Sequence, residues 1–119
     1  MNYSILPEPA FLREVKRLSK KYKSFKQDLE RLQDELLANP TAGADLGDGV
    51  HKVRIAIASK NRGKSHGARV ITYVYKIDEE SGIITLLTIY DKEKVDTISA
   101  EEIVRLKELA KAHLGISAQ

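Results

Sequence analysis

The 119-residue chain contains no cysteine and no tryptophan, and it has only three prolines, two phenylalanines and one methionine. The absence of cysteine excludes disulfide bonds and thiolate metal ligands, and it agrees with a reducing compartment. The three histidines, His51, His66 and His113, lack the four-residue spacing of a helical zinc site. We therefore expect no bound metal and no other cofactor.

Long apolar runs are also missing. No segment approaches the roughly 20 apolar residues that cross a bilayer, and residues 1–11 lack the basic and apolar regions of a secretory signal. The length fits one domain, residues 1–119, because domains of about 100–150 residues are the commonest. We expect a single cytoplasmic domain that does not contact a membrane.

The middle of the chain lacks acidic residues. Residues 51–76 contain seven Lys and Arg residues and no Asp or Glu, whereas residues 1–50 contain eight of each kind. Residues 77–119 contain five basic and nine acidic residues. Four of the seven cations lie in the glycine-broken stretch ASKNRGKSHGARV, residues 58–70. Such an uncompensated positive segment attracts polyphosphates, including nucleic acids.

Two apolar patterns before this stretch predict two amphipathic helices, because their residues recur at spacings of three and four. The first pattern is Phe11, Val15, Leu18 and Tyr22, and the second is Phe25, Leu29, Leu32 and Leu36. Ser24 is placed to cap the second helix, and Asn39-Pro40 ends it because the residue before proline disfavours helical geometry. The short joint between the helices predicts an antiparallel helical hairpin.

Three runs rich in β-branched and aromatic residues follow, at residues 51–60, 69–77 and 83–90. They predict three consecutive strands joined by hairpins. Residues 2–7 are long enough for one more short strand, and the Gly, Pro and Asp content of residues 38–49 is typical of a loop.

A final helix is predicted from Ser99, because Glu102 follows it at capping-box spacing and apolar residues then recur on one face. The expected fold is therefore α+β, in the order β-α-α-β-β-β-α. A mostly antiparallel sheet packs against an N-terminal helical hairpin, and a C-terminal helix completes the domain.

Alternation in the run at residues 51–60 predicts where its charges lie. The aliphatic side chains point to one face of the strand, which we expect to meet the helices, and the cations point to the other face. Hairpin pairing then brings these cations near the ends of the next two strands. The residues expected to edge this shared surface are Arg54, Lys60, Arg69 and Tyr90 to Lys92.

Two other interpretations of the basic stretch are weaker. The letters GKS at residues 63–65 occur in nucleotide-binding P-loops, but that motif requires a glycine where this chain has Ala58, and a helix where this chain has a strand pattern. Lysine and arginine also protect sheet edges from aggregation, but one or two cations suffice for that purpose. Binding to a nucleic-acid backbone accounts better for the whole cluster.

The block KVRIAIASKNRGKSHGARVITYVY (52–75), preceded by LLANPTAG (36–43) and followed by LLTIYDKEK (86–94), resembles the RelE/HigB toxins of bacterial toxin–antitoxin modules. The resemblance covers nearly the whole chain, and residues 54–73 and 86–92 carry its most specific parts. It implies a compact α+β fold and cleavage of messenger RNA in the decoding site of the ribosome. It also implies a cognate antitoxin, which in many relatives is a helix-turn-helix protein encoded next to the toxin.

The implied reaction is attack of a ribose 2′-OH on the adjacent phosphate, which needs no metal and leaves a cyclic phosphate and a 5′-OH. One group must take the 2′-OH proton, others must stabilise the charge of the transition state, and another must protonate the departing oxygen. Arg54 and Arg69 suit stabilisation, because each guanidinium can engage two phosphate oxygens. Lys60 and Lys64 are candidates for base or acid, with neighbouring cations expected to lower their pKa.

Tyr90 is a candidate for stacking on a base or orienting the 2′-OH, and Lys92 for protonating the leaving oxygen. Tyr90 is equally well interpreted as a packed core aromatic, and Lys92 as a partner of neighbouring acids. The predicted catalytic residues are Arg54, Lys60, Lys64, Arg69, Tyr90 and Lys92. The predicted RNA-binding residues are Lys52, Arg62 and His66, of which His66 is also typical of a solvated loop histidine.

Some relatives carry a histidine near the C-terminal tyrosine, where this chain has Asp91 and Lys92. The identity of the general acid and base therefore stays open. We predict a ribosome-dependent messenger-RNA endonuclease toxin whose partners are the ribosome, messenger RNA and a cognate antitoxin. The alternatives are a toxin that acts on DNA gyrase and an RNA-binding module that has lost cleavage.

Overall fold

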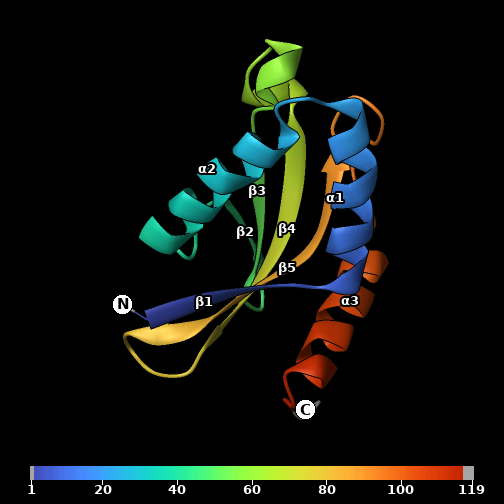
Figure 1. Ribbon diagram of the computed structural model, residues 1–119. Coiled ribbons are helices and arrows are strands. Elements are labelled where there is room, and N and C mark those ends of the chain that lie inside the picture. The colour runs from blue at the N-terminus through green and yellow to red at the C-terminus, as the bar shows by residue number, and fades with distance from the viewer. Residues whose placement is uncertain (1, 117–119) are drawn as a thin grey trace.

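The computed structural model describes residues 2–116 and consists of a five-stranded sheet with helices on both faces (Figure 1). The order of the strands is β1-β5-β4-β3-β2, with β1 parallel to β5 and the other neighbours antiparallel. This arrangement confirms the predicted α+β fold. In chain order the elements are β1 (Asn2–Pro7), α1 (Pro9–Lys21), α2 (Phe25–Ala38), β2 (Ala44–Gly47), β3 (Val50–Ile55), the short 3₁₀ turns η1 (Ala58–Lys60) and η2 (Lys64–His66), β4 (Ala68–Lys76), β5 (Ser81–Asp91) and α3 (Ala100–His113).

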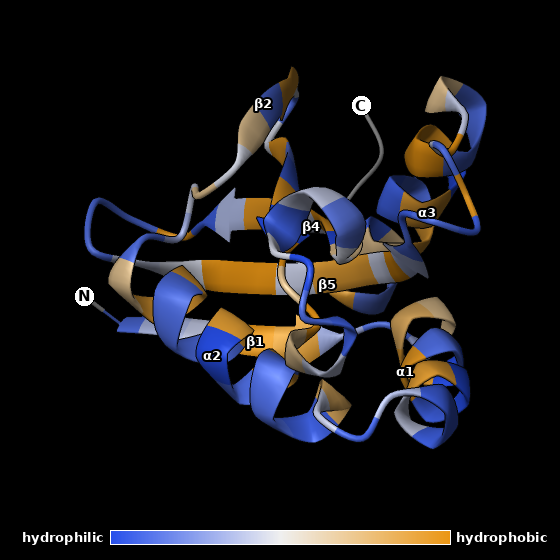
Figure 2. Cartoon of the chain, turned by 90° about the horizontal axis from the view of Figure 1, so that it is seen from above, coloured by the Kyte–Doolittle hydropathy of each residue, from blue (hydrophilic) through white to orange (hydrophobic). Residues whose placement is uncertain are grey.

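Helices α1 and α2 cover one face of the sheet, and α3 lies against the other face (Figure 2). Their apolar sides point toward the strands because the three- and four-residue spacing gathers them on one side of each helix. Phe11 and Leu18 of α1 and Leu32 of α2 are buried against Val53 and Val70 of the sheet. Among the residues that the structure describes, no helix has the length and apolar character to cross a membrane.

Helix α3 begins as predicted, since the Ser99 hydroxyl accepts the backbone N–H of Glu102 at 3.0 Å. The carboxylate of Glu102 binds Arg105 at 2.7 Å instead of returning to Ser99, so half of the expected capping box forms. Leu106 and Ala110 are buried against the sheet face opposite α1 and α2. This face carries a second, smaller apolar cluster.

Strand β2 falls inside the segment that the sequence indicated as a loop. Its four residues, Ala44–Gly47, pair with β3 at the edge of the sheet, and all four are exposed. The alternation of Ala44, Asp45 and Leu46 is too short to indicate a strand within a segment rich in Gly, Pro and Asp, and no side chain of β2 is buried. The prediction of a loop over residues 38–49 is therefore wrong for this part.

The strand predicted over residues 51–60 ends at Ile55, because the chain turns into η1. Asp28 accepts the N–H of Ala58 at 3.2 Å, and the Ser24 hydroxyl accepts the N–H of Ser59 at 2.8 Å. Ser24 therefore does not cap α2 as predicted; its hydroxyl donates to Asp28 at 2.7 Å. The start of α2 thus holds the turn that follows β3.

Candidate functional site

Three of the predicted residues form a row across the sheet. Arg54 of β3 lies opposite Arg69 of β4, and Arg69 lies opposite Tyr90 of β5. Directly opposed residues on neighbouring strands point to the same face and have Cβ atoms about 5 Å apart. The Arg54–Arg69–Tyr90 row therefore lies side by side on the face of the sheet that α3 partly covers.

Arg69 is the most constrained member of the row, with only 7% of its surface exposed. Its guanidinium donates to the carbonyl oxygens of Lys64 at 2.9 Å, Ala68 at 3.1 Å and Ser65 at 3.4 Å. Burial and the neighbouring Arg54 lower the pKa of Arg69. The backbone of η2 therefore fixes the orientation of this cation.

Among the residues that the structure describes, neither arginine of the row has an acidic partner. Within residues 2–116, no carboxylate oxygen lies within 4 Å of Arg54 or Arg69. A buried cation without a counter-ion is costly, and two adjacent cations also repel each other. Such an arrangement is typical of a site that an anion completes.

Tyr90 is packed as the core interpretation predicted, with 5% of its surface exposed and Leu106 and Ala110 in the same cluster. Its hydroxyl is buried and has no hydrogen-bond partner in the described part of the chain. Nearly all buried hydroxyls in proteins are hydrogen-bonded. The Tyr90 oxygen therefore has an unused hydrogen-bonding capacity next to Arg69, and a ligand would reach it only after a covering side chain moves.

Two glycines shape the loop that borders the row. Gly63 has a positive φ of 74°, which side chains rarely adopt, and a Cβ on Gly67 would lie 1.9 Å from the carbonyl oxygen of Ile55. The carbonyl oxygen of Gly67 accepts the N–H of Lys92 at 2.9 Å. The loop therefore packs closely against the ends of β3 and β5.

Lys60 lies on the other face of the sheet, in a partly buried network that we call the clamp: Lys60, Asp91, Glu93 and Tyr22. The Lys60 ammonium donates to Asp91 at 2.6 Å and to Glu93 at 2.8 Å. The Tyr22 hydroxyl donates to the second oxygen of Asp91, and the Tyr22 ring lies 5.1 Å from the ammonium. The clamp joins the end of α1, η1 and the end of β5.

The structure corrects two expectations for Lys60. It does not share a surface with Arg54, because β3 ends before it and the alternation stops there. Burial alone would lower the pKa of Lys60, but its hydrogen bonds to Asp91 and Glu93 outweigh burial and raise the pKa. The prediction that neighbouring cations lower it is therefore wrong.

Lys92 and Lys52 both lie near Asp96. The Lys92 ammonium donates to the side chain and to the carbonyl oxygen of Asp96, both at 2.7 Å. The pKa of Asp96 is lowered mainly by Lys92 and more weakly by Lys52. Lys92 thus has an acidic partner, as the alternative interpretation held, and Lys52 lies two residues before Arg54 on the face of the row.

The remaining predicted residues lie on the loop. Arg62 is half exposed and donates to Glu93 at 2.9 Å. His66 lies with its Nδ1 atom 3.0 Å from the hydroxyl of Ser65. The exposed side chain of Lys64 borders a groove beside α2, away from the row, and has no carboxylate within 4 Å among the described residues.

The family model for the RelE toxin of the RelE / RelB toxin-antitoxin system matches residues 11–119, which include the row and the clamp. The chain belongs to the RelE toxin family. This RelE toxin is therefore the toxin component of a toxin–antitoxin module, and an antitoxin is its partner. The resemblance inferred from residues 54–73 and 86–92 is confirmed.

In this RelE toxin, the row presents two guanidinium groups and a phenol on one face. Guanidinium groups bind phosphate oxygens in pairs, and a phenol can donate a hydrogen bond to the same group. During a reaction at a bound phosphate, its negative charge would increase. The donors that stabilise this charge are already oriented. The arrangement can therefore bind a phosphodiester and stabilise additional negative charge on it.

Proposed function

We propose that this RelE toxin cleaves messenger RNA on the ribosome by attack of a 2′-OH on the adjacent phosphate, and that its cognate antitoxin neutralises it. The Arg54–Arg69–Tyr90 row carries this proposal, because its two guanidinium groups lie on adjacent strands without a carboxylate partner in the described chain. The scissile phosphate is the anion that completes the site.

Arg69 and Arg54 bind the non-bridging oxygens of that phosphate. The carbonyl oxygens of Lys64 and Ser65 hold Arg69 in place before substrate arrives. A donor that is already oriented stabilises the transition state without the cost of reorganisation. Arg54 is exposed and reaches the phosphate from the neighbouring strand.

Tyr90 and two lysines serve proton transfer and positioning in this proposal. Tyr90 orients the 2′-OH through its hydroxyl once substrate binding uncovers it. Lys92, just beyond the end of β5, protonates the 5′ oxygen. The neutral amine of Lys64 acts as the base once the loop turns its side chain from the groove beside α2 toward the row. Lys60 holds the loop through the clamp, since its ammonium already binds two carboxylates. Lys52, Arg62 and His66 contact the RNA beside the cleaved bond.

Replacing Tyr90 with phenylalanine separates the hydroxyl from the ring. The ring keeps its packing, and loss of a buried hydroxyl without a partner leaves the unfolding midpoint equal or higher. We expect cleavage to slow by about 100-fold, the lower range for a group that assists proton transfer. Thermal unfolding and transcript-cleavage rates measure the two effects. An unchanged cleavage rate would show that the Tyr90 hydroxyl does not take part in the reaction.

Ribosome dependence is tested with two reporter transcripts that differ only in the start codon. Induction of the toxin is expected to create new 5′ ends inside the translated reporter, and none in the copy that lacks a start codon. Equal cleavage of both would contradict ribosome dependence. Growth arrest with intact transcripts and broken DNA would indicate instead that the toxin acts on DNA gyrase.

A further inference from the structure

Helix α1 and the turn after it form a second basic surface. Residues 13–26 contain seven Lys and Arg residues and one acidic residue, Glu14, and all seven cations are exposed. Residues 28–50 contain six acidic residues and a single basic one, Arg31. The equal totals over the first 50 residues therefore conceal a separation of charge.

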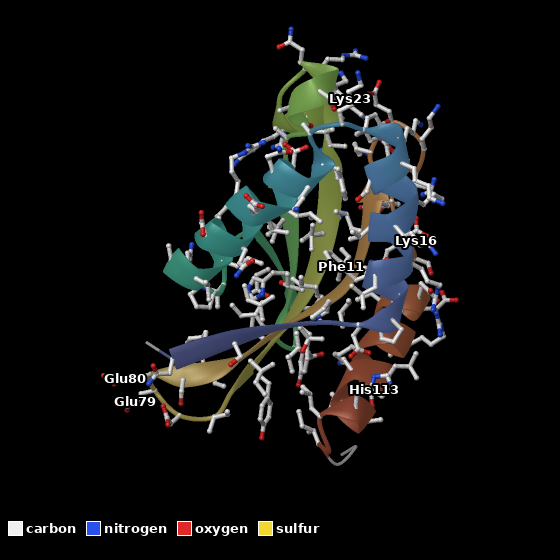
Figure 3. The ribbon with its side chains drawn as sticks, in the orientation of Figure 1. Phe11, Lys16, Lys23, Glu79, Glu80 and His113 are labelled. Atoms are coloured by element: carbon white, nitrogen blue, oxygen red, sulfur yellow. The ribbon has the colours of Figure 1, made fainter. Side chains whose placement is uncertain are left out.

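The cations of α1 gather on its outer side. Arg13, Lys16, Arg17 and Lys20 recur at spacings of three and four, and with Lys23 in the following turn they form what we call the α1 ridge. Figure 3 shows Lys16 pointing away from the domain and Phe11 pointing toward the sheet. Like charges at these spacings destabilise an isolated helix, so the ridge is unfavourable for α1 itself.

Few acids compensate the ridge. Arg17 is paired with Glu14. Arg13, Lys16, Lys20 and Lys23 have no carboxylate oxygen within 4 Å in the portion of the chain that the structure describes. The acidic turn of Asp78, Glu79 and Glu80 lies at the other end of the molecule, and Figure 3 places Glu79 and Glu80 far from Lys23.

The ridge cannot serve the phosphate bound at the row. Helix α1 packs on Val53 and Val70, which point to the sheet face opposite Arg54 and Arg69. A ligand on the ridge is therefore a different segment from the one held at the row. The ridge has no aromatic side chain, whereas protein interfaces depend on buried anchors such as aromatic residues, and three of its five cations are lysines. Exposed, flexible cations suit phosphate contacts, which gain from counterion release.

We infer that the α1 ridge docks the sugar–phosphate backbone of structured RNA, which for a ribosome-dependent toxin is ribosomal RNA. This inference rests on the proposed function for the identity of that RNA. The ridge binds the ribosome, and the row acts on the messenger RNA that the ribosome holds.

The test compares two triple variants with the same loss of three charges. One is Lys16→Gln/Lys20→Gln/Lys23→Gln on the ridge. The control, Lys76→Gln/Arg105→Gln/Lys111→Gln, changes cations on β4 and α3. Co-sedimentation with purified ribosomes is measured over a series of salt concentrations. We expect the ridge variant to bind about tenfold or more weakly at low salt, and its log-affinity to depend less steeply on log-salt by about two units.

Equal binding by the two variants would overturn the inference. So would a ridge variant that loses the antitoxin but keeps the ribosome, because the ridge would then be a protein interface. Failure of the proposed function is seen separately, as intact translated transcripts after induction of the wild-type toxin. Binding to ribosomes is measured without cleavage, so the two failures are distinguishable.

Discussion

Replacing Arg69 with alanine is expected to slow cleavage of a translated message by about 10²- to 10³-fold, the usual effect of removing one oriented donor from a developing charge. Arg69 is the central residue of the row and is anchored by three carbonyl oxygens of its own loop and strand. Alanine removes the cation together with its hydrogen bonds to these carbonyl oxygens. The rate is measured in a purified translation system with the wild-type toxin as reference.

Two further variants show whether the position or merely the charge matters. Arg62→Ala removes a half-exposed loop cation that binds Glu93, and we expect less than about a threefold effect. Arg69→Lys keeps a charge but loses the planar fork, so an intermediate rate is expected. Unfolding midpoints establish that each variant is folded. A larger loss in Arg62→Ala than in Arg69→Ala would contradict the assigned row.

Replacing Asp91 with asparagine is expected to lower the free energy of unfolding by about 3 to 5 kcal/mol, because it leaves the buried Lys60 ammonium without its nearest counter-ion. Asp91 is 1% exposed and the Lys60 side chain 7% exposed. Asp96→Asn is the matched control, since the Asp96 side chain is 95% exposed beside Lys92. It should cost at most about 1 kcal/mol. Urea unfolding measures both.

A second substitution tests the cause of this loss. Lys60→Met in the Asp91→Asn background removes the stranded charge while keeping an apolar chain of similar length. We expect the double variant to be more stable than Asp91→Asn alone, because a buried ammonium that keeps only the partly exposed Glu93 as a counter-ion costs more than a missing pair. Losses that add would show that Asp91 acts through something other than Lys60.

The clamp also predicts how stability depends on pH. Burial would raise the pKa of Asp91, but hydrogen bonds from Lys60, Tyr22 and the Glu93 N–H lower it below 3.8. That stabilisation is present above this value and is lost as the pH falls through the lowered pKa. The raised pKa of Lys60 gives stabilisation that is present below 10.5 and lost at higher pH. The stability difference between wild type and Asp91→Asn should be constant from about pH 5 to 9 and shrink outside this range.

Much of the fold could be predicted from the sequence, because periodicity reports burial. Phe11, Leu18 and Leu32 recur at helical spacing since one side of each helix meets the sheet. The extent of β3 could not be predicted, since Ser24 and Asp28 end it from a helix about 30 residues earlier. Local pattern carries no information on such a distant hydrogen bond.

The candidate site was predictable in part for a related reason. The row follows from strand pairing, and hairpins place Arg54, Arg69 and Tyr90 together. The clamp could not be predicted because the partners of Lys60, Asp91 and Glu93, follow it by 31 and 33 residues. Counting charges along a short segment does not reveal such distant pairs. Tyr22 belongs to the apolar pattern of α1, and only its hydroxyl, at the end of the helix, indicates a polar contact there.

The parallel pairing of β1 with β5 has a consequence for synthesis. Asn2 pairs with Ser81, and Pro7 pairs with Leu86. The first strand to be synthesised, β1, therefore cannot pair until the last strand, β5, has been made. Pairing across such a separation forms late, because a long loop must close first. Tyr90 lies in that same final strand. In a nascent chain, the Arg54–Arg69–Tyr90 row is therefore not assembled until most of the chain has left the exit tunnel.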